Sequence, residues 1–493
     1  MEKRKGWDIS NKALIWLAVV LIPASIGIVC WRAFHYSFIS DDWAMLQRVV
    51  FQSPKVYTMN ALHPGLAGHA IYRPLGMGYF WLMYHLFGLN ALGFHACAFV
   101  IHAINSMMVA FLANGILRHR LLALTAGLLY ASSFRIHFEP LLWMVGIFDL
   151  GGMFCFLSAL LFYIRGKILP SVLVFLAGLF IKEHLIVLPA VIGLYSHFER
   201  RQSLKDAAKQ IMPYAAAVLF VYLPAKMLGL HGVHVRADNP YALSIGKHVL
   251  QNLETLIGLG LIGLCPSLWL KISMSLTCIV GIIQSIRYKQ RLNLRSTTTM
   301  LVLWAIIAAS PVCLLKNHVM EGYYFTYSYP ALIMLALVVA TRFRVHKSAM
   351  LVVVSTLVIA NIAGSTAMFA EQDGLGVTAA SVDDYLIPRA HFQQMLTGYI
   401  DSHRARVKQN VRVIVVSNND RFLYCSLDEQ LQTLTHDATV SGVVVPAMQH
   451  DTNGYSVMSP TPEDPRRLAC ERLDKDQTLH LQIIGDAIQE RPL

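Results

Sequence analysis

The sequence carries little charge for its length. Asp, Glu, Lys and Arg make up 14% of the 493 residues, whereas 55% are hydrophobic. This low share of charge excludes an ordinary soluble protein, in which roughly 25% of the residues are charged. Apolar runs of about 20 residues, the length that crosses a bilayer, recur between Ala13 and Phe369. The composition therefore predicts an all-α polytopic membrane protein.

Signatures of several other protein classes are also absent. The chain has no glycine-rich phosphate loop, no soluble nucleotide-binding domain, no Cys/His finger spacing and no basic patch interleaved with aromatics. The net charge of +12 is therefore not interpreted as a sign of nucleic-acid binding, and no nucleic-acid partner is expected. The sequence contains no metal motif and no cofactor is predicted, but a requirement for a divalent cation is left as an alternative. No small-residue cleavage site follows the first apolar run, which predicts an uncleaved anchor.

The positive charge instead marks one side of the membrane. Basic clusters separate the apolar runs into pairs, at residues 3–5, 118–120, 165–167, 199–205, 287–295 and 342–347. If all of them are cytoplasmic, the chain makes about 11 crossings, with the N-terminus inside and the C-terminus outside. The short run Leu75–Leu89 breaks this alternation and is predicted to be a surface helix. One further crossing is expected within Leu253–Ile286.

The chain divides into two predicted parts. Residues 1–370 form a transmembrane domain whose first outer loop is 35–74, and residues 371–493 are polar. The polar part has β-branched runs around a helical piece, which predicts a small extracytoplasmic α/β domain. It contains Cys425 and Cys470, for which a disulfide and two free thiols are both open.

Ionisable residues gather in the turns that are predicted to face outside. Such a residue within a membrane span costs roughly 2.5–3.5 kcal/mol, so it usually faces a cavity or a partner. The first outer turn carries adjacent carboxylates, Asp41 and Asp42. Other polar and charged residues in or near the outward turns are Arg73, His137, Glu139, Asp149, Lys182, Glu183, His184 and Lys316. Their convergence on one membrane face predicts a functional site.

Each of these features also has an ordinary structural explanation. Asp41 and Asp42 are typical caps of a following helix. Lys182-Glu183 is equally consistent with an interfacial ion pair. His102 and Asn105 lie on one helical stripe, which more often makes interhelical hydrogen bonds than a catalytic or metal site.

A series of short motifs occurs in a fixed order along roughly the first two hundred residues. They are Phe38–Asp42, Tyr72–Leu75, Phe87–Asn90, His95, His102–Asn105, His137–Glu139, Trp143, Gly146, Asp149–Leu150, Lys182–Glu183 and Pro189. In this order they resemble the polytopic glycosyltransferases of the C-type fold, and most closely the protein O-mannosyltransferase-like branch that often carries tetratricopeptide repeats. The chain lacks those repeats, and it has Ile147 and Phe134-Arg135 where the family usually has Arg and His-Pro.

The resemblance implies an inverting enzyme that moves a sugar from a polyprenyl-phosphate carrier to an extracytoplasmic protein, glycan or lipid acceptor. It places the catalytic carboxylate in the first outer loop, with Asp41 preferred as the base and Asp42 orienting the acceptor or a neighbouring cation. Candidates for binding the phosphate of the donor are Arg73, Lys182, His184 and Lys316. Residues expected to shape the site are His102, Asn105, His137, Glu139, Asp149 and Glu183.

Two other functions stay open at this point. A transporter or flippase of lipid-linked sugars is expected to show related halves with interrupted helices, and no such internal similarity is found. A non-catalytic membrane scaffold does not explain the charged turns. The absence of Asn-x-Ser/Thr sequons from the outward segments favours a bacterial inner membrane over an endoplasmic reticulum.

Overall fold

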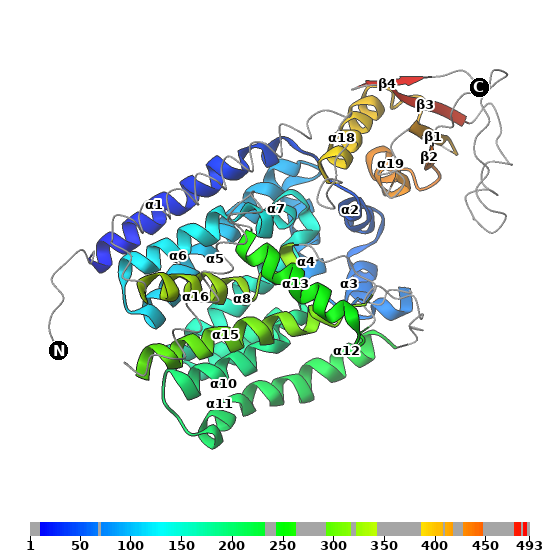
Figure 1. Cartoon of the computed structure of the whole chain (residues 1–493). Helices are drawn as coiled ribbons and strands as arrows, with labels where there is room; N and C mark the ends of the chain where they lie inside the picture. Colours follow the sequence, from blue (N-terminus) through cyan, green and yellow to red (C-terminus); the bar gives the residue numbers. More distant parts are fainter. Residues whose placement is uncertain are drawn as a thin grey trace.

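The computed structural model describes residues 10–67, 71–231, 243–262, 292–316, 322–342, 386–407, 410–417, 427–446, 478–484 and 487–490. This described part is mostly helical, and a small sheet lies near its C-terminal end (Figure 1). The predicted crossing at 349–369 and most of the crossing predicted within Leu253–Ile286 lie outside the described residues. Cys425 and Cys470, and the predicted domain boundary at 370, lie outside them as well.

The helices of the N-terminal half follow one another closely. They are α1 (Asn11–Cys30), η1 (Trp31–His35), α2 (Asp41–Phe51), α3 (Pro54–Leu62), η2 (Pro64–Ala67), α4 (Pro74–Phe87), α5 (Ala91–Leu117), α6 (Arg120–Ser132), α7 (Phe134–Leu142), η3 (Met144–Gly146), α8 (Ile147–Ile164) and α9 (Ile168–Leu179). The second helical group is η4 (Glu183–Val187), α10 (Leu188–Phe198), α11 (Leu204–Ala217), η5 (Val218–Tyr222), α12 (Leu223–Gly229), α13 (Lys247–Ile262), α15 (Leu292–Cys313), η6 (Gly322–Phe325) and α16 (Tyr329–Arg342).

Several of these helices are long and apolar enough to cross a bilayer. Among the described residues there are five, or up to six if the bent pair Arg120–Ser132 and Ile136–Leu142 is one span. The five are Lys12–His35, Ala91–Leu117, Met144–Ile164, Leu204–Gly229 and Ser296–Cys313. They identify the chain as an integral membrane protein. The exact number of about 11 crossings stays a prediction.

The segments between α1 and α5 include residues 35–74, the predicted first outer loop. Ser53 caps α3 by accepting a hydrogen bond from the Val56 amide, and Pro54 occupies its first turn. Pro74 likewise starts α4, and Arg73 before it has a non-helical backbone, with φ and ψ of −139° and 61°. α4 has 14 residues and coincides with the predicted surface helix. Its location at the membrane surface stays a prediction.

The corner between α7 and α8 is tightly built. A Cβ atom at Gly146 would lie 2.3 Å from the Cα atom of Pro140, so only glycine fits this approach. The chain therefore turns within the short η3 helix and enters α8 with Asp149 in the first turn. A carboxylate is favourable there, because the N-terminal end of a helix carries partial positive charge.

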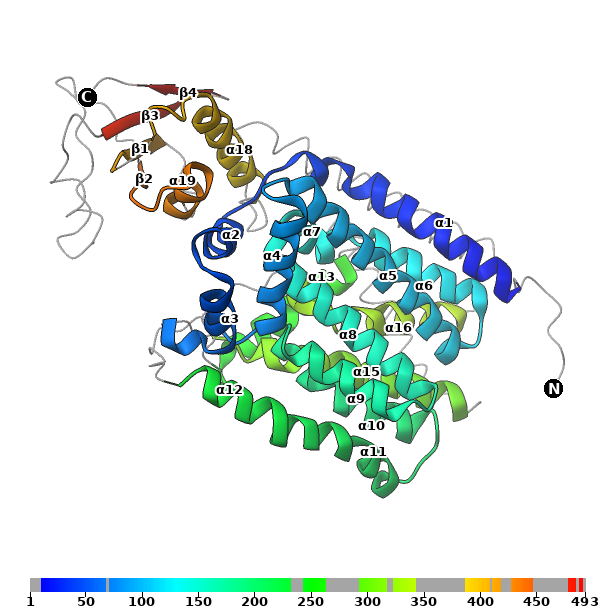
Figure 2. The ribbon, with the colours of Figure 1, turned by 180° about the vertical axis from the view of Figure 1, so that it is seen from behind.

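The C-terminal elements combine two helices with a four-stranded sheet. They are α18 (Leu386–Ser402), β1 (Arg412–Ser417), α19 (Leu427–Thr435), β2 (Ser441–Pro446), β3 (Thr478–Ile484) and β4 (Ala487–Glu490). The strand order is β2-β1-β3-β4, with β1 parallel to both neighbours and β3 antiparallel to β4. In both views of the ribbon, α2 lies between α19 and the membrane helices (Figures 1 and 2).

Candidate functional site

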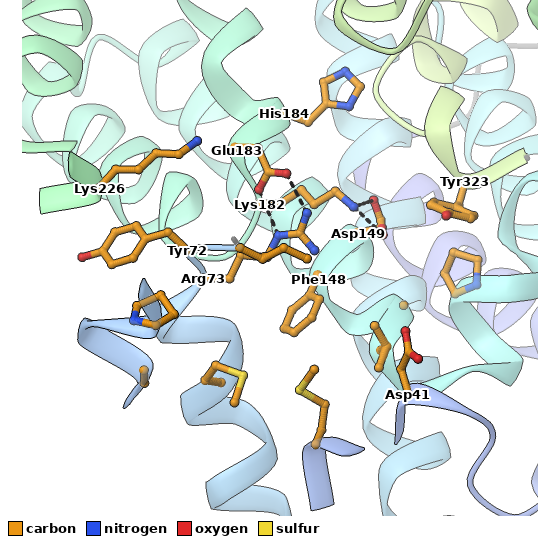
Figure 3. A pocket seen from close by; sticks show the side chains of 18 of the residues that line it. Asp41, Tyr72, Arg73, Phe148, Asp149, Lys182, Glu183, His184, Lys226 and Tyr323 are labelled. Atoms are coloured by element: carbon orange, nitrogen blue, oxygen red, sulfur yellow. Dashed lines mark hydrogen bonds and ion pairs between the residues drawn. The ribbon is translucent and has the colours of Figure 1, made fainter. Parts of the chain in front are cut away.

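A cavity of about 580 Å³ is lined in part by residues of the segment 35–74, the predicted first outer loop. Its wall is formed by α2 and α3, the segment before α4, the corner between α7 and α8, the segment around η4, and α12. The cavity brings together seven of the residues that the sequence predicts for the site. These are Glu139 and the six that Figure 3 labels, Asp41, Arg73, Asp149, Lys182, Glu183 and His184.

Two ion pairs cross this cavity wall. Arg73 binds Glu183 through two hydrogen bonds, 2.9 Å from Nε to Oε2 and 2.6 Å from Nη2 to Oε1. Lys182 Nζ lies 2.8 Å from Oδ1 of Asp149 and 3.0 Å from its Oδ2. Partial loss of solvent around Glu183, whose side chain is still partly exposed at the cavity wall, raises its pKa, but the charge and hydrogen bonds of Arg73 outweigh this effect and hold that pKa below its usual range. Two cations of the predicted phosphate site, Arg73 and Lys182, are thus already paired with carboxylates.

The two adjacent carboxylates of the first loop occupy different environments. Asp41 begins α2, is exposed and lines the cavity. Asp42 is fully buried, and its oxygens accept hydrogen bonds from the backbone amides of Ile39 at 2.9 Å, Met144 at 3.3 Å and Val145 at 2.9 Å. It therefore fastens the first loop to the corner between α7 and α8. Burial raises the pKa of Asp42 to about 8, and the three amides oppose this shift.

The histidine in the cavity wall is a neutral group. Nε2 of His184 lies 2.6 Å from the carbonyl oxygen of Ala308, so it donates the hydrogen bond. Burial lowers the pKa of His184, and the ring is uncharged at neutral pH. Without a ligand, His184 can therefore offer a hydrogen bond or a ring face but carries no charge of its own.

Three predicted site residues lie in the helix packing outside the cavity wall. His102 Nε2 lies 3.2 Å from the carbonyl oxygen of Ala131, and Asn105 Nδ2 donates to that of Leu150 at 3.0 Å. These are the interhelical hydrogen bonds that the sequence offers as an alternative to a catalytic role. The ring of His137 packs 4.4 Å from that of His102. Among the described residues, no group of three or more His, Cys, Asp or Glu side chains is placed to hold a metal ion.

Lys316 is also placed outside the cavity, on an exposed bend. A different lysine, Lys226 of α12, lines the cavity, with its Nζ 5.7 Å from the ring of Tyr222. No ion pair to Lys226 occurs within the described residues. The sequence does contain a signal for Lys226, because it is an ionisable residue in the mostly apolar stretch 211–229, and such a residue usually faces a cavity or a partner. Arg48 was missed too, although it follows Asp41 by two helical turns and so lies on the same face of α2.

Comparison with known proteins supports the sequence resemblance over part of the chain. No protein-family model matches it. The protein O-mannosyl-transferase Tmtc1 of Drosophila melanogaster is 32% identical over 133 residues, which are 26% of this chain and 15% of that protein. This match confirms the resemblance to the O-mannosyltransferase-like branch. The chain thus spans a small part of the length of this relative.

A solved structure gives a distant likeness over nearly the whole chain. ArnT from Cupriavidus metallidurans, in a crystal structure bound to undecaprenyl phosphate, aligns with 96% of this chain and 92% of its own. The TM-score is 0.46 and the sequence identity is 11%.

Proposed function

We propose that the protein is a membrane glycosyltransferase that moves a sugar from a polyprenyl-phosphate carrier to an extracytoplasmic acceptor, with inversion at the anomeric carbon. The observation that carries this proposal is a cavity whose wall contains both the Asp41 carboxylate and the cations Arg73 and Lys182 (Figure 3). The partial match to a protein O-mannosyl-transferase supports the reaction class. A hexosyl donor of the mannosyl type, a protein, glycan or lipid acceptor and a bacterial inner membrane complete the proposal.

Asp41 is proposed as the general base. It accepts the proton of the acceptor hydroxyl as the oxygen attacks the anomeric carbon, while the bond from that carbon to the phosphate oxygen breaks and its electron pair leaves with the phosphate. A single displacement of this kind inverts the configuration at carbon. General-base help of this type contributes typically 10²–10⁴-fold. The exposure of Asp41 towards the cavity supports this role, whereas buried Asp42 is proposed to position it.

The leaving phosphate is proposed to bind to the cationic part of the wall. Arg73 and Lys182 are held in place by their carboxylate partners, so their donors are oriented before the donor lipid arrives. Lys226 adds a positive charge that no described carboxylate neutralises. His184 is proposed to contact the donor as a neutral group, and Lys316 is left out because it lies outside the cavity.

An apolar edge of the cavity fits the lipid part of such a donor. Ile71, Ile186 and Leu243 line the cavity and keep 43%, 46% and 64% of their surface exposed. Exposed aliphatic side chains at the rim of a cavity are favourable where lipid, rather than water, covers them. This combination of a charged wall and an apolar rim favours a phosphate attached to a long hydrocarbon chain.

The proposal is tested with the purified full-length chain in detergent or nanodiscs and a radiolabelled polyprenyl-phosphate hexose. Asp41→Asn keeps the side-chain size but removes the proton-accepting charge, so transfer is expected to fall about 10²–10⁴-fold with donor binding retained. Asp206→Asn, an identical change on the exposed surface of α11, is the matched control. Equal transfer by wild type and Asp41→Asn would remove Asp41 from the mechanism. Movement of the labelled lipid across vesicles without transfer would identify a flippase instead.

A further inference from the structure

Ser40, which directly precedes Asp41, has an unusual backbone conformation. Its φ and ψ are 50° and −116°, and the Asp42 amide donates to the Ile39 carbonyl at 3.0 Å. This is the geometry of the first central position in a type II′ turn, where glycine is strongly favoured because it has no Cβ. A serine keeps this conformation only where its surroundings hold it. The direction in which Asp41 leaves the turn depends on that conformation.

A residue far along the chain holds this turn. The Ser40 amide donates to Oε1 of Gln393 on α18 at 2.8 Å, and Gln393 is fully buried. Gln393 is itself fastened, because its carbonyl oxygen accepts a hydrogen bond from Nε2 of Gln430 on α19 at 2.7 Å. Gln430 Nε2 also donates to Thr397 Oγ1 at 3.1 Å, so α19 holds the part of α18 that carries Gln393.

The rest of α2 also packs against the C-terminal elements. Trp43 and Leu46 of α2 belong to the same buried cluster as Leu431 of α19. Gln47 Nε2 donates to Oε1 of Gln432 at 2.6 Å, one to two turns along α2 from Asp41. The ribbon shows the same proximity from both sides (Figures 1 and 2). The C-terminal helices are therefore in contact with the helix that begins with the proposed base.

We infer that Gln393 is a positioning residue for Asp41, and that through it the C-terminal helices complete the active site. The inference rests on the proposed function for its catalytic consequence. Gln393 keeps Ser40 in the strained turn, the turn sets the first residue of α2, and Asp41 thereby faces the cavity. A displacement of about 1 Å in a reacting group can cost on the order of 10²-fold in rate.

The first test needs no activity. Hydrogen exchange by mass spectrometry compares wild type, Gln393→Leu and Gln47→Ala in the full-length chain. Gln393→Leu keeps buried volume but removes the accepting oxygen, so amides in the Ile39–Trp43 turn are expected to exchange roughly 3- to 10-fold faster, the effect of about one lost hydrogen bond. Gln47→Ala removes another contact of the same interface and is expected to leave this turn unchanged. Unchanged exchange in Gln393→Leu, or equal acceleration in both variants, overturns the inference.

The second test uses sugar transfer and a rescue. Gln393→Leu is expected to lower kcat about 10- to 100-fold with the KM for the donor unchanged. Glycine adopts the conformation of Ser40 without strain, so in a Ser40→Gly background the same change is expected to cost less than about threefold. A merely structural role of Gln393 would give the same loss in both backgrounds and overturn the inference. If wild type transfers no sugar while exchange responds as expected, the proposed function fails and the support of the turn by Gln393 stands.

Discussion

Lys182 and Glu183 are neighbours in sequence, yet their side chains bind partners on different helices. Lys182 pairs with Asp149 of α8 at 2.8 Å, and Glu183 pairs with Arg73 at the start of α4. One dipeptide therefore ties two elements of the cavity wall together. The pairing also fixes the position of both cations before any ligand binds, which reduces the reorganisation that phosphate binding requires.

The position of Lys182 depends on a glycine of α8. A Cβ at Gly152 would lie 2.3 Å from the hydroxyl of Tyr327 and 2.9 Å from Cβ of Lys182, and Tyr327 is fully buried. Gly152→Ala is expected to push Lys182 away from Asp149, lower transfer about 10- to 100-fold and destabilise the protein by about 1–3 kcal/mol. Transfer assays and thermal unfolding measure the two effects.

The adjacent glycine is the control for this prediction. A Cβ at Gly151 would have its nearest neighbour, Cγ2 of Ile181, at 3.5 Å, which is an ordinary contact. Gly151→Ala is therefore expected to resemble wild type in both assays. Identical behaviour of the two alanine variants would show that the packing around Lys182 does not govern activity.

The ion pair of Arg73 and Glu183 is expected to be energetically coupled. A double-mutant cycle with Arg73→Ala and Glu183→Ala measures this coupling, for which contacting residues give about 0.5–3 kcal/mol. The side chain of Glu183 is 39% exposed, so solvent screening places the expected value near the lower end, at about 1 kcal/mol. The exposed pair of Lys209 and Asp206 is the reference, for which no measurable coupling is expected. Equal coupling in both pairs contradicts a special role for the bidentate geometry.

The sequence predicts the membrane class and much of the cavity wall because both depend on local signals. A charge in or beside an apolar run usually faces a cavity or a partner in any fold, and this rule finds Arg73, Lys182 and Asp149. The partner of each charge depends on the three-dimensional fold. Asp41 and Asp42 look alike in sequence, but Asp42 accepts hydrogen bonds from the amides of Met144 and Val145, about a hundred residues away, and these bonds cannot be read from the residues around it. The bond from Gln393 to Ser40 spans 353 residues and leaves no local pattern at all.

Asp42 is expected to make stability depend on pH. Its pKa is raised from 3.8 to about 8 by burial, so the folded state keeps its proton over a range in which the unfolded state has lost it. Stability contributed by this group is therefore greatest below about pH 4 and falls as the pH rises towards about 8. Asparagine does not titrate, so wild type is expected to lose stability relative to Asp42→Asn between about pH 5 and about pH 8. Thermal unfolding at both pH values measures this difference, and a difference independent of pH contradicts the assignment.

The phosphate site proposed from the structure contains Lys226, whereas the one predicted from the sequence alone contains Lys316. Lys226 lines the cavity, whereas Lys316 lies on an exposed bend outside it. A hydrogen bond to a charged group is worth about 1.5–3 kcal/mol, so Lys226→Ala is expected to weaken binding of a polyprenyl-phosphate donor about 10- to 100-fold. Lys316→Ala is expected to bind it as wild type does. Titration of each purified variant with a fluorescent polyprenyl phosphate gives the dissociation constants. Because the probe carries no sugar, the measurement reports the phosphate and lipid contacts alone. If Lys316→Ala weakens binding and Lys226→Ala leaves the dissociation constant unchanged, the phosphate site does not lie in this cavity.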